Sequence, residues 1–145
     1  MVGRCNFIKG GLALSLAFCM AGYGHARTVL NLQIETTGQS DESLQNEAAA
    51  RACRKFRPTQ NQLVQFFNRA YAVEAAKIMH DRYSPCYATG KLRFSDGYFG
   101  EWVMYSSGVA RFTFNGGDVV YLYHRGNRWY DPNACTYGLA DEGEC

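Results

Sequence analysis

Residues 86–125 decide the fold, and they read CYATGKLRFSDGYFGEWVMYSSGVARFTFNGGDVVYLYHR. Glycine-containing turn sequences at 96–97, 107–108 and 115–118 interrupt this stretch about every ten residues, a spacing typical of antiparallel sheets. Glycine and asparagine favour such turns because they tolerate the positive φ angles that tight hairpins need. The segments between the turns are rich in aromatic and β-branched residues, which are common in strands. We therefore expect a continuous antiparallel meander with strands at Ala88–Ser95, Phe99–Ser106, Val109–Asn115 and Asp118–Arg125.

Alternation within these runs divides the side chains between two faces, since successive residues of a strand point to opposite sides of the sheet. One predicted face is apolar, and it should pack against helices. Its members are Leu92, Phe94, Trp102, Met104, Ala110, Phe112, Phe114, Val120 and Leu122.

The other face combines tyrosines with arginines, two residue types that are enriched where proteins bind one another. Trp129, which follows Arg128, is expected to extend this surface. Tyrosine and threonine are also good strand formers, so an ordinary exposed sheet face is an open alternative. The candidate binding residues are Arg93, Tyr105, Arg111, Tyr121, Tyr123 and Trp129.

Two helices are expected before the meander. Thr59 and Gln62 have the spacing of a capping box, and an apolar stripe at helical spacing follows them. This pattern predicts one long helix over residues 59–83, because Pro85 disfavours helix for the residue before it. A shorter helix is expected over residues 44–53.

The segment Val29–Glu35 alternates between apolar and polar residues and predicts an edge strand, which a polar loop at 36–43 follows. Together these elements predict an α+β fold. One long and one short helix should pack on one face of an antiparallel β-meander of four to five strands.

Residues 1–26 have the three parts of a secretory signal peptide. Arg4 and Lys9 make the start basic, residues 10–22 are apolar, and small residues precede a cleavage point after Ala26. An uncleaved membrane anchor is the alternative, but the apolar stretch is shorter than the roughly 20 residues of a spanning helix. We expect a signal peptide at 1–26 and a single disulfide-stabilised domain at 27–145, in the periplasm or secreted.

Cleavage would change the net charge of the chain from +2 to zero, because it removes two of 15 basic residues and none of the 13 acidic ones. A neutral chain lacks the basic surface of a dedicated nucleic-acid binder. We therefore expect no nucleic-acid partner, and no stable membrane insertion after cleavage.

Four of the six cysteines stay in the mature chain. An even number in a short exported chain indicates two disulfides. A zinc site is the alternative, but no two of these cysteines have the close spacing typical of zinc ligands, and we expect no metal. Of the three possible pairings, we expect Cys53–Cys86 and Cys135–Cys145.

The chain carries none of the motifs of serine hydrolases, nucleotide-binding P-loops, zinc proteases or dinucleotide-binding proteins. His80 and His124 could serve as the acid–base pair of a small secreted hydrolase, ribonuclease-like or glycan-acting, if they share a pocket. A histidine near a helix end is also explained by its interaction with the helix dipole. No cofactor is expected.

The preferred hypothesis is a small exported bacterial protein that acts by binding another protein in the cell envelope. An immunity or inhibitor protein against a toxin or a cell-wall hydrolase fits a cleavable signal, one small domain and the tyrosine–arginine face. A ligand-binding module is a third alternative. Tyr98 and Phe99 lie beside a turn, where aromatic side chains can insert into a partner, stack on a sugar or fold back over the core.

Overall fold

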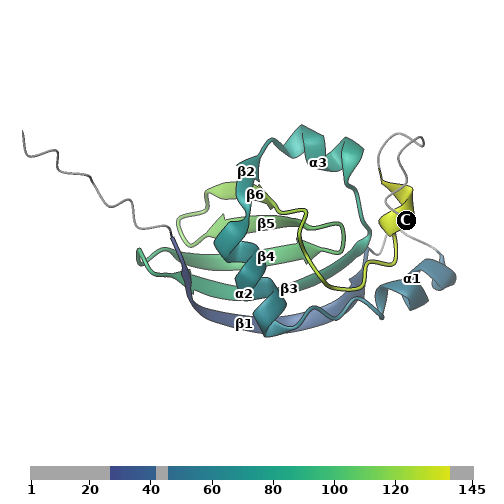
Figure 1. Ribbon diagram of the computed structural model, residues 1–145, viewed down its shortest axis with the longest axis horizontal. Helices are drawn as coiled ribbons and strands as arrows, with labels where there is room; N and C mark the ends of the chain where they lie inside the picture. Colours follow the sequence, from purple (N-terminus) through teal and green to yellow (C-terminus); the bar gives the residue numbers. More distant parts are fainter. Residues whose placement is uncertain (1–26, 42–45, 138–145) are drawn as a thin grey trace, which may run out of the picture.

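An antiparallel sheet of six strands, in the order β1-β3-β4-β5-β6-β2, forms the centre of the fold. The computed structural model describes residues 27–41 and 46–137. Helix α2 crosses one face of the sheet, and α1 and the C-terminal segment lie together at one end of it (Figure 1). The α+β class is confirmed. The sheet has more strands than the expected four to five, and the helices are three short ones in the described part of the chain.

The meander of the sequence prediction is present, with each strand end within two residues of its expected position. The Gly97 and Gly108 turns adopt positive φ angles of 89° and 83°, which explains why glycine occupies these hairpins. The four strands are β3 (Cys86–Phe94), β4 (Phe99–Tyr105), β5 (Val109–Phe114) and β6 (Val119–Tyr123).

The predicted apolar face forms the core. Its six central members are buried, and Phe114, Val120 and Leu122 are partly buried against them. Helix α2 (Gln60–Arg69) covers this face. Its Thr59 cap accepts a hydrogen bond from the Gln62 N–H, and the Gln62 side chain accepts one from the Thr59 N–H, so the capping box is confirmed. The helix buries Leu63, Phe66 and Phe67.

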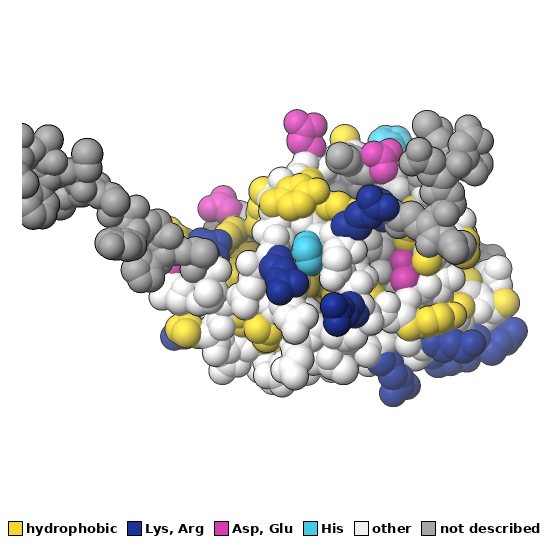
Figure 2. Space-filling model, in the orientation of Figure 1, with side chains coloured by type: hydrophobic (Ala, Val, Ile, Leu, Met, Phe, Trp, Pro, Cys, Tyr) yellow, Lys and Arg dark blue, Asp and Glu magenta, His cyan; other side chains and the backbone are white. Residues whose placement is uncertain are grey.

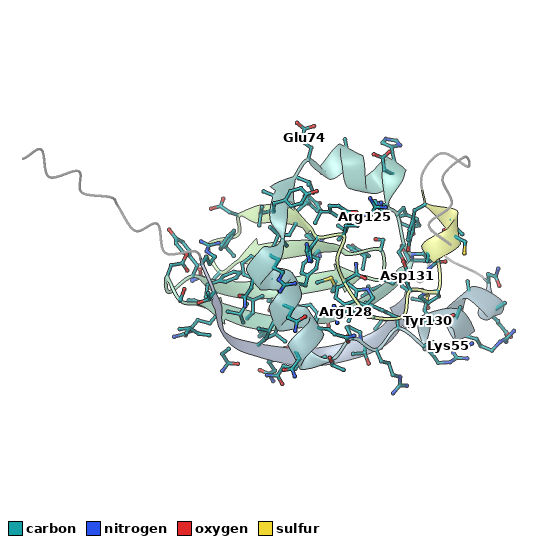
Figure 3. All side chains as sticks on the ribbon, viewed as in Figure 1. Lys55, Glu74, Arg125, Arg128, Tyr130 and Asp131 are labelled. Atoms are coloured by element: carbon teal, nitrogen blue, oxygen red, sulfur yellow. A yellow bond between two sulfur atoms is a disulfide. The ribbon has the colours of Figure 1, made fainter. Side chains whose placement is uncertain are left out.

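The prediction of one long helix over 59–83 is wrong. The backbone becomes extended at Ala70, and Tyr71–Val73 forms β2, which pairs with β6. The unpaired edge of β6 supplies the backbone partners that make a strand more favourable here than a further helical turn. Helix α3 (Ala75–Asp81) then follows, and Glu74 points away from the domain between β2 and α3 (Figure 3).

Strand β1 (Val29–Ser40) lies at the opposite edge and pairs with β3, as an edge strand should. It is longer than expected and takes up most of the predicted polar loop. Irregularities in its pairing near Thr36 accommodate the polar residues. Gly38 has a φ of 66°, and a Cβ there would lie 3.0 Å from the Arg54 Cα, so glycine allows β1 to pass close to the end of α1.

Helix α1 (Glu47–Cys53) is shorter than expected and is capped by the Asn46 side chain. Its last residue forms a disulfide with Cys86, the first residue of β3, and this confirms the expected Cys53–Cys86 pair. Cys135 is also disulfide-bonded. Its expected partner, Cys145, lies outside the described residues.

The C-terminal segment is held over the ends of β3 and β4 by a group of hydrogen bonds centred on Asp131. One Asp131 carboxylate oxygen accepts bonds from the Ser106 hydroxyl at 2.6 Å, the Asn133 N–H at 3.0 Å and the Tyr137 hydroxyl at 3.1 Å. Ser84 extends the group through its contact of 2.7 Å with Ser106. This network lets a segment with one short helix, η1 (Ala134–Thr136), pack on the sheet end.

Stability should fall at alkaline pH because Tyr137 must stay protonated in the fold. Burial raises the pKa of Tyr137 from 10.0 to about 12, and the Asp131 carboxylate acts in the same direction. The folded state therefore keeps a proton that the unfolded chain loses. This contribution, about 2–3 kcal/mol, is present below pH 10 and lost between about pH 10 and 12. Urea unfolding at successive pH values measures it.

Tyr137→Phe provides the comparison, since it removes the titrating hydroxyl and keeps the ring. We expect a shallower decline in its free energy of unfolding above pH 10 than in the wild type. Burial also raises the pKa of Tyr83 and Tyr105, so some decline should persist. Equal declines in the two proteins would show that Tyr137 is not the source.

Candidate functional site

The sheet face turned away from α2, here called the open face, carries most of the predicted binding residues. Figure 1 views the molecule from the α2 side, so this face is turned from the reader. Two hollows lie on it, at opposite ends of the central strands.

The first hollow, here called the arginine pocket, has a volume of about 360 Å³. Arg111 lies between Val103 of β4 and Tyr121 of β6 in the strand register. Tyr87 and Tyr105 pair across β3 and β4 with ring centroids 6.4 Å apart. The pocket is lined by Asp41, Ser84, Pro85, Tyr87, Val103, Tyr105 and Arg111.

The pocket carries one cationic and one anionic side chain, Arg111 and Asp41. No hydrogen bond or ion pair joins Arg111 to any described residue, although Asp41 and two tyrosines line the same pocket. Burial raises the pKa of Tyr105, while Arg111 acts to lower it, so the Tyr105 hydroxyl stays protonated at neutral pH. The Asp41 carboxylate accepts a bond of 3.3 Å from the Tyr83 hydroxyl.

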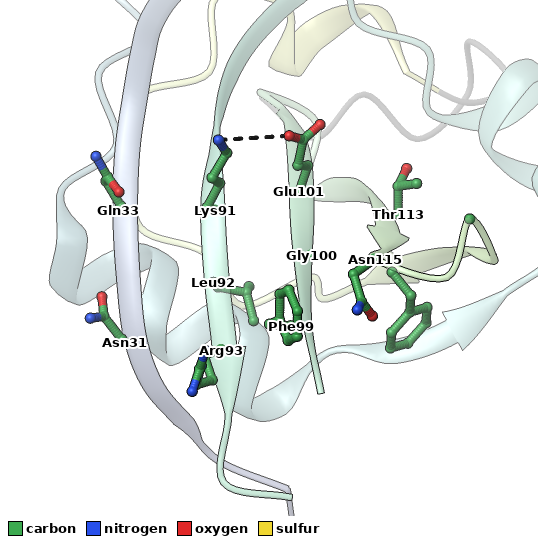
Figure 4. Close-up of a pocket in the computed structure, with 12 residues that line it drawn as sticks. Asn31, Gln33, Lys91, Leu92, Arg93, Phe99, Gly100, Glu101, Thr113 and Asn115 are labelled. Atoms are coloured by element: carbon green, nitrogen blue, oxygen red, sulfur yellow. Dashed lines mark ion pairs between the residues drawn. The ribbon is translucent and has the colours of Figure 1, made fainter. Parts of the chain in front are cut away.

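The second hollow, here called the Phe99 groove, has a volume of about 810 Å³ and crosses β1, β3, β4 and β5 (Figure 4). Phe99 forms part of its lining, and the Arg93 guanidinium lies 5.3 Å from the centre of the Phe99 ring. Lys91 forms ion pairs with Glu35 at 3.3 Å and with Glu101 at 3.8 Å.

The structure thus separates the predicted binding residues. Arg93 faces Phe99 across the strands, whereas Tyr105 is six residues further along β4. That is about 20 Å at the usual rise of a strand. Tyr105 and Arg111 line the arginine pocket, and Tyr121 lies beside Arg111 on the neighbouring strand. Tyr123 lies toward the β2 edge, where its ring contacts Tyr71 at 5.8 Å.

Trp129 is not on the open face, contrary to its expected place in the binding surface. It is only 8% exposed and packs on the α2 side, with ring centroids 5.9 Å from Phe56 and 5.8 Å from Phe66. Its indole N–H donates a bond of 2.8 Å to the Ser106 carbonyl. The satisfied N–H and the apolar neighbours make burial favourable.

The two candidate catalytic histidines are separate. His80 is exposed at the end of α3, and His124 follows β6 with its ring 6.3 Å from Phe66. The described histidines appear as two distinct cyan patches in Figure 2. Neither lines the arginine pocket or the Phe99 groove. We therefore find no geometry among the described residues that favours the hydrolase alternative.

Sequence reasoning missed several residues of the hollows. Tyr87 was missed because β3 begins two residues earlier than expected, although its alternation with Lys91 and Arg93 places it on the same face. Asp41 lies after the end of β1, and only the tertiary structure brings it to Tyr105. Asn31 and Gln33 belong to the polar side of β1, but the neighbour of that strand was unknown.

No group of His, Cys, Asp and Glu side chains within 27–41 and 46–137 has the arrangement of a metal site. None of the helices in these ranges is long and apolar enough to cross a membrane. No protein-family model, curated protein or solved structure matches the chain.

Proposed function

We propose that this chain is an exported bacterial protein that binds another protein through the open face of its sheet. In this proposal the signal sequence at 1–26 directs it to the periplasm or the exterior. There it acts as an immunity or inhibitor protein against a toxin or a cell-wall hydrolase. The Cys53–Cys86 disulfide supports an oxidising location, where such bonds persist.

The single observation that carries the proposal is the arginine pocket. Arg111 forms no ion pair with a described carboxylate, that of Asp41 in the same lining included, and three tyrosines lie nearby. A partner's aspartate or glutamate could complete this site with charge-assisted hydrogen bonds, which are stronger than neutral ones. The tyrosine rings would add large, rather rigid contact area and would shield the ion pair from water.

The chemistry of the pocket also suggests how binding could inhibit an enzyme. Hydrolases of glycans and many nucleases depend on acidic residues. A pocket that pairs with a carboxylate at the mouth of an active site would obstruct the substrate. The partner expected here therefore presents an exposed acidic side chain at its binding surface.

Charge reversal at the pocket should strongly reduce capture of the partner. The mature protein is immobilised and exposed to periplasmic extract of the source bacterium. Arg111→Glu should reduce the specifically retained protein by about tenfold or more, because it sets two like charges against each other. Tyr121→Ala should reduce it to a smaller extent, through lost contact area.

Arg128→Glu is the matched control, because Arg128 is an exposed arginine on the α2 side (Figure 3). This variant changes the net charge equally and should retain the partner as the wild type does. Circular dichroism must first show that all variants are folded. Failure to capture any protein, or equal capture by Arg111→Glu, would refute the proposed surface.

A further inference from the structure

We infer that the Phe99 groove is a second binding site, and that it takes a neutral oligosaccharide. The groove lies on the open face at the opposite end from the arginine pocket, so it is separate from the proposed protein-binding site. Its volume of about 810 Å³ falls within the range of small-ligand sites, about 300–1,000 Å³. A short oligosaccharide of a few rings would fit such a space.

Most of the charge at the groove is paired, which disfavours polyanions such as nucleic acids. Lys91 is paired with both Glu35 and Glu101, and the dashed line in Figure 4 marks the second of these pairs. Glu35 lies beside the lining rather than in it, so the lining itself holds Lys91, Arg93 and Glu101, and its net charge is only +1. A polyanion would gain little net attraction here and would meet the Glu101 carboxylate in the groove.

The uncharged side chains of the groove suit both the apolar C–H groups and the polar hydroxyls of a sugar. Phe99 is 42% exposed, and its ring offers an apolar surface on which the C–H groups of a pyranose can pack. The side chains of Asn31, Gln33 and Asn115 make no hydrogen bond to another described residue. Each amide offers a donor and an acceptor together, which suits neighbouring sugar hydroxyls. Thr113 adds a hydroxyl to the same lining (Figure 4).

An extended peptide is a poorer occupant, because it needs free backbone groups to add as a strand. Strands β3, β4 and β5 beneath the groove are paired on both sides, and β1 pairs with β3 on the groove side. The groove therefore presents side chains rather than an open sheet edge. Sugar hydroxyls can form hydrogen bonds with these side chains, so they need no unpaired backbone N–H or C=O groups.

Nuclear magnetic resonance titration of the mature protein tests the inference. The probes are cellotetraose, maltotetraose and tetra-N-acetylchitotetraose, each added to millimolar concentration. At least one should shift the amide resonances of Phe99, Gly100, Thr113 and Asn115 in a saturable manner. Phe99→Ala should raise the dissociation constant by about tenfold or more, and Asn115→Ala by a smaller factor.

Two controls separate this site from the rest of the surface. Tyr130→Ala removes an exposed tyrosine elsewhere in the chain and should leave the dissociation constant unchanged. Arg111→Glu should also leave it unchanged, so the oligosaccharide site can fail or succeed independently of the protein-binding proposal. The inference is overturned if no probe shifts the groove resonances, or if Phe99→Ala binds as the wild type does. Tighter, salt-dependent binding of a sulfated oligosaccharide would also overturn it.

Discussion

Replacing Cys53 and Cys86 together by alanine is expected to lower the free energy of unfolding by about 4 kcal/mol. The disulfide joins residues 33 apart, and cross-linking a loop of this length removes considerable entropy from the unfolded chain. Both cysteines are fully buried, so their loss also leaves small defects in the core. The bond ties α1 to the start of β3, and no other covalent link joins these elements. Urea unfolding followed by tryptophan fluorescence measures the change.

Reduction of the wild-type protein supplies the control for this effect. Dithiothreitol should destabilise the wild type by at least as much as the double substitution does, because it also opens the disulfide of Cys135. The double variant should lose less on reduction than the wild type. A double variant within about 1 kcal/mol of the wild type would show that α1 is held mainly by packing.

Trp129→Ala is expected to cost about 3–5 kcal/mol, the range for truncating a buried aromatic residue. The substitution would empty the space between Phe56 and Phe66 and leave the Ser106 carbonyl without its donor. Trp129→Phe should cost less, because it keeps an aromatic ring and loses chiefly the hydrogen bond. Thermal or urea unfolding of the two variants measures the difference.

Tyr130→Ala is the matched control, since Tyr130 is the next residue in the chain and is 58% exposed. Its substitution should change the free energy of unfolding by no more than about 0.5 kcal/mol. If Trp129→Ala were as stable as Tyr130→Ala, the indole would not belong to the core. In that case Trp129 would again be a candidate for the binding surface.

Local patterns suffice to predict the meander and its two faces. The turn glycines and the alternation around Trp102 and Phe112 act within neighbouring residues, so they are readable without tertiary information. The Thr59 capping box was also predictable, because it depends on residue type and spacing along the chain. The expected Cys53–Cys86 pair was one of three possible pairings, and only the structure decides among them.

Elements that depend on distant partners could not be predicted. Residues 71–73 continue a helical pattern, and only the free edge of β6 makes them a strand. The polar end of β1 resembles a loop until its pairing with β3 is known. In both places tertiary pairing overrides the local preference.

The sequence was enough to predict which face of the sheet carries the candidate site, but not how its residues divide between two hollows. Alternation placed Tyr105, Arg111 and Tyr121 together on one side of the sheet. It could not show that Arg93 lies in a different hollow, since that depends on how the strands align. Trp129 follows the last strand, where alternation no longer applies, and its burial depends on Phe56 and Phe66 from earlier in the chain.

Site-specific photo-crosslinking tests most directly the claim that a protein partner contacts the open face. A benzoylphenylalanine is placed at position 121 on the open face or, for comparison, at the exposed position 130, and living cells are irradiated. We expect a discrete adduct with one envelope protein from position 121 and none from position 130. An adduct from position 130 alone, or no adduct from either position, would contradict the claim.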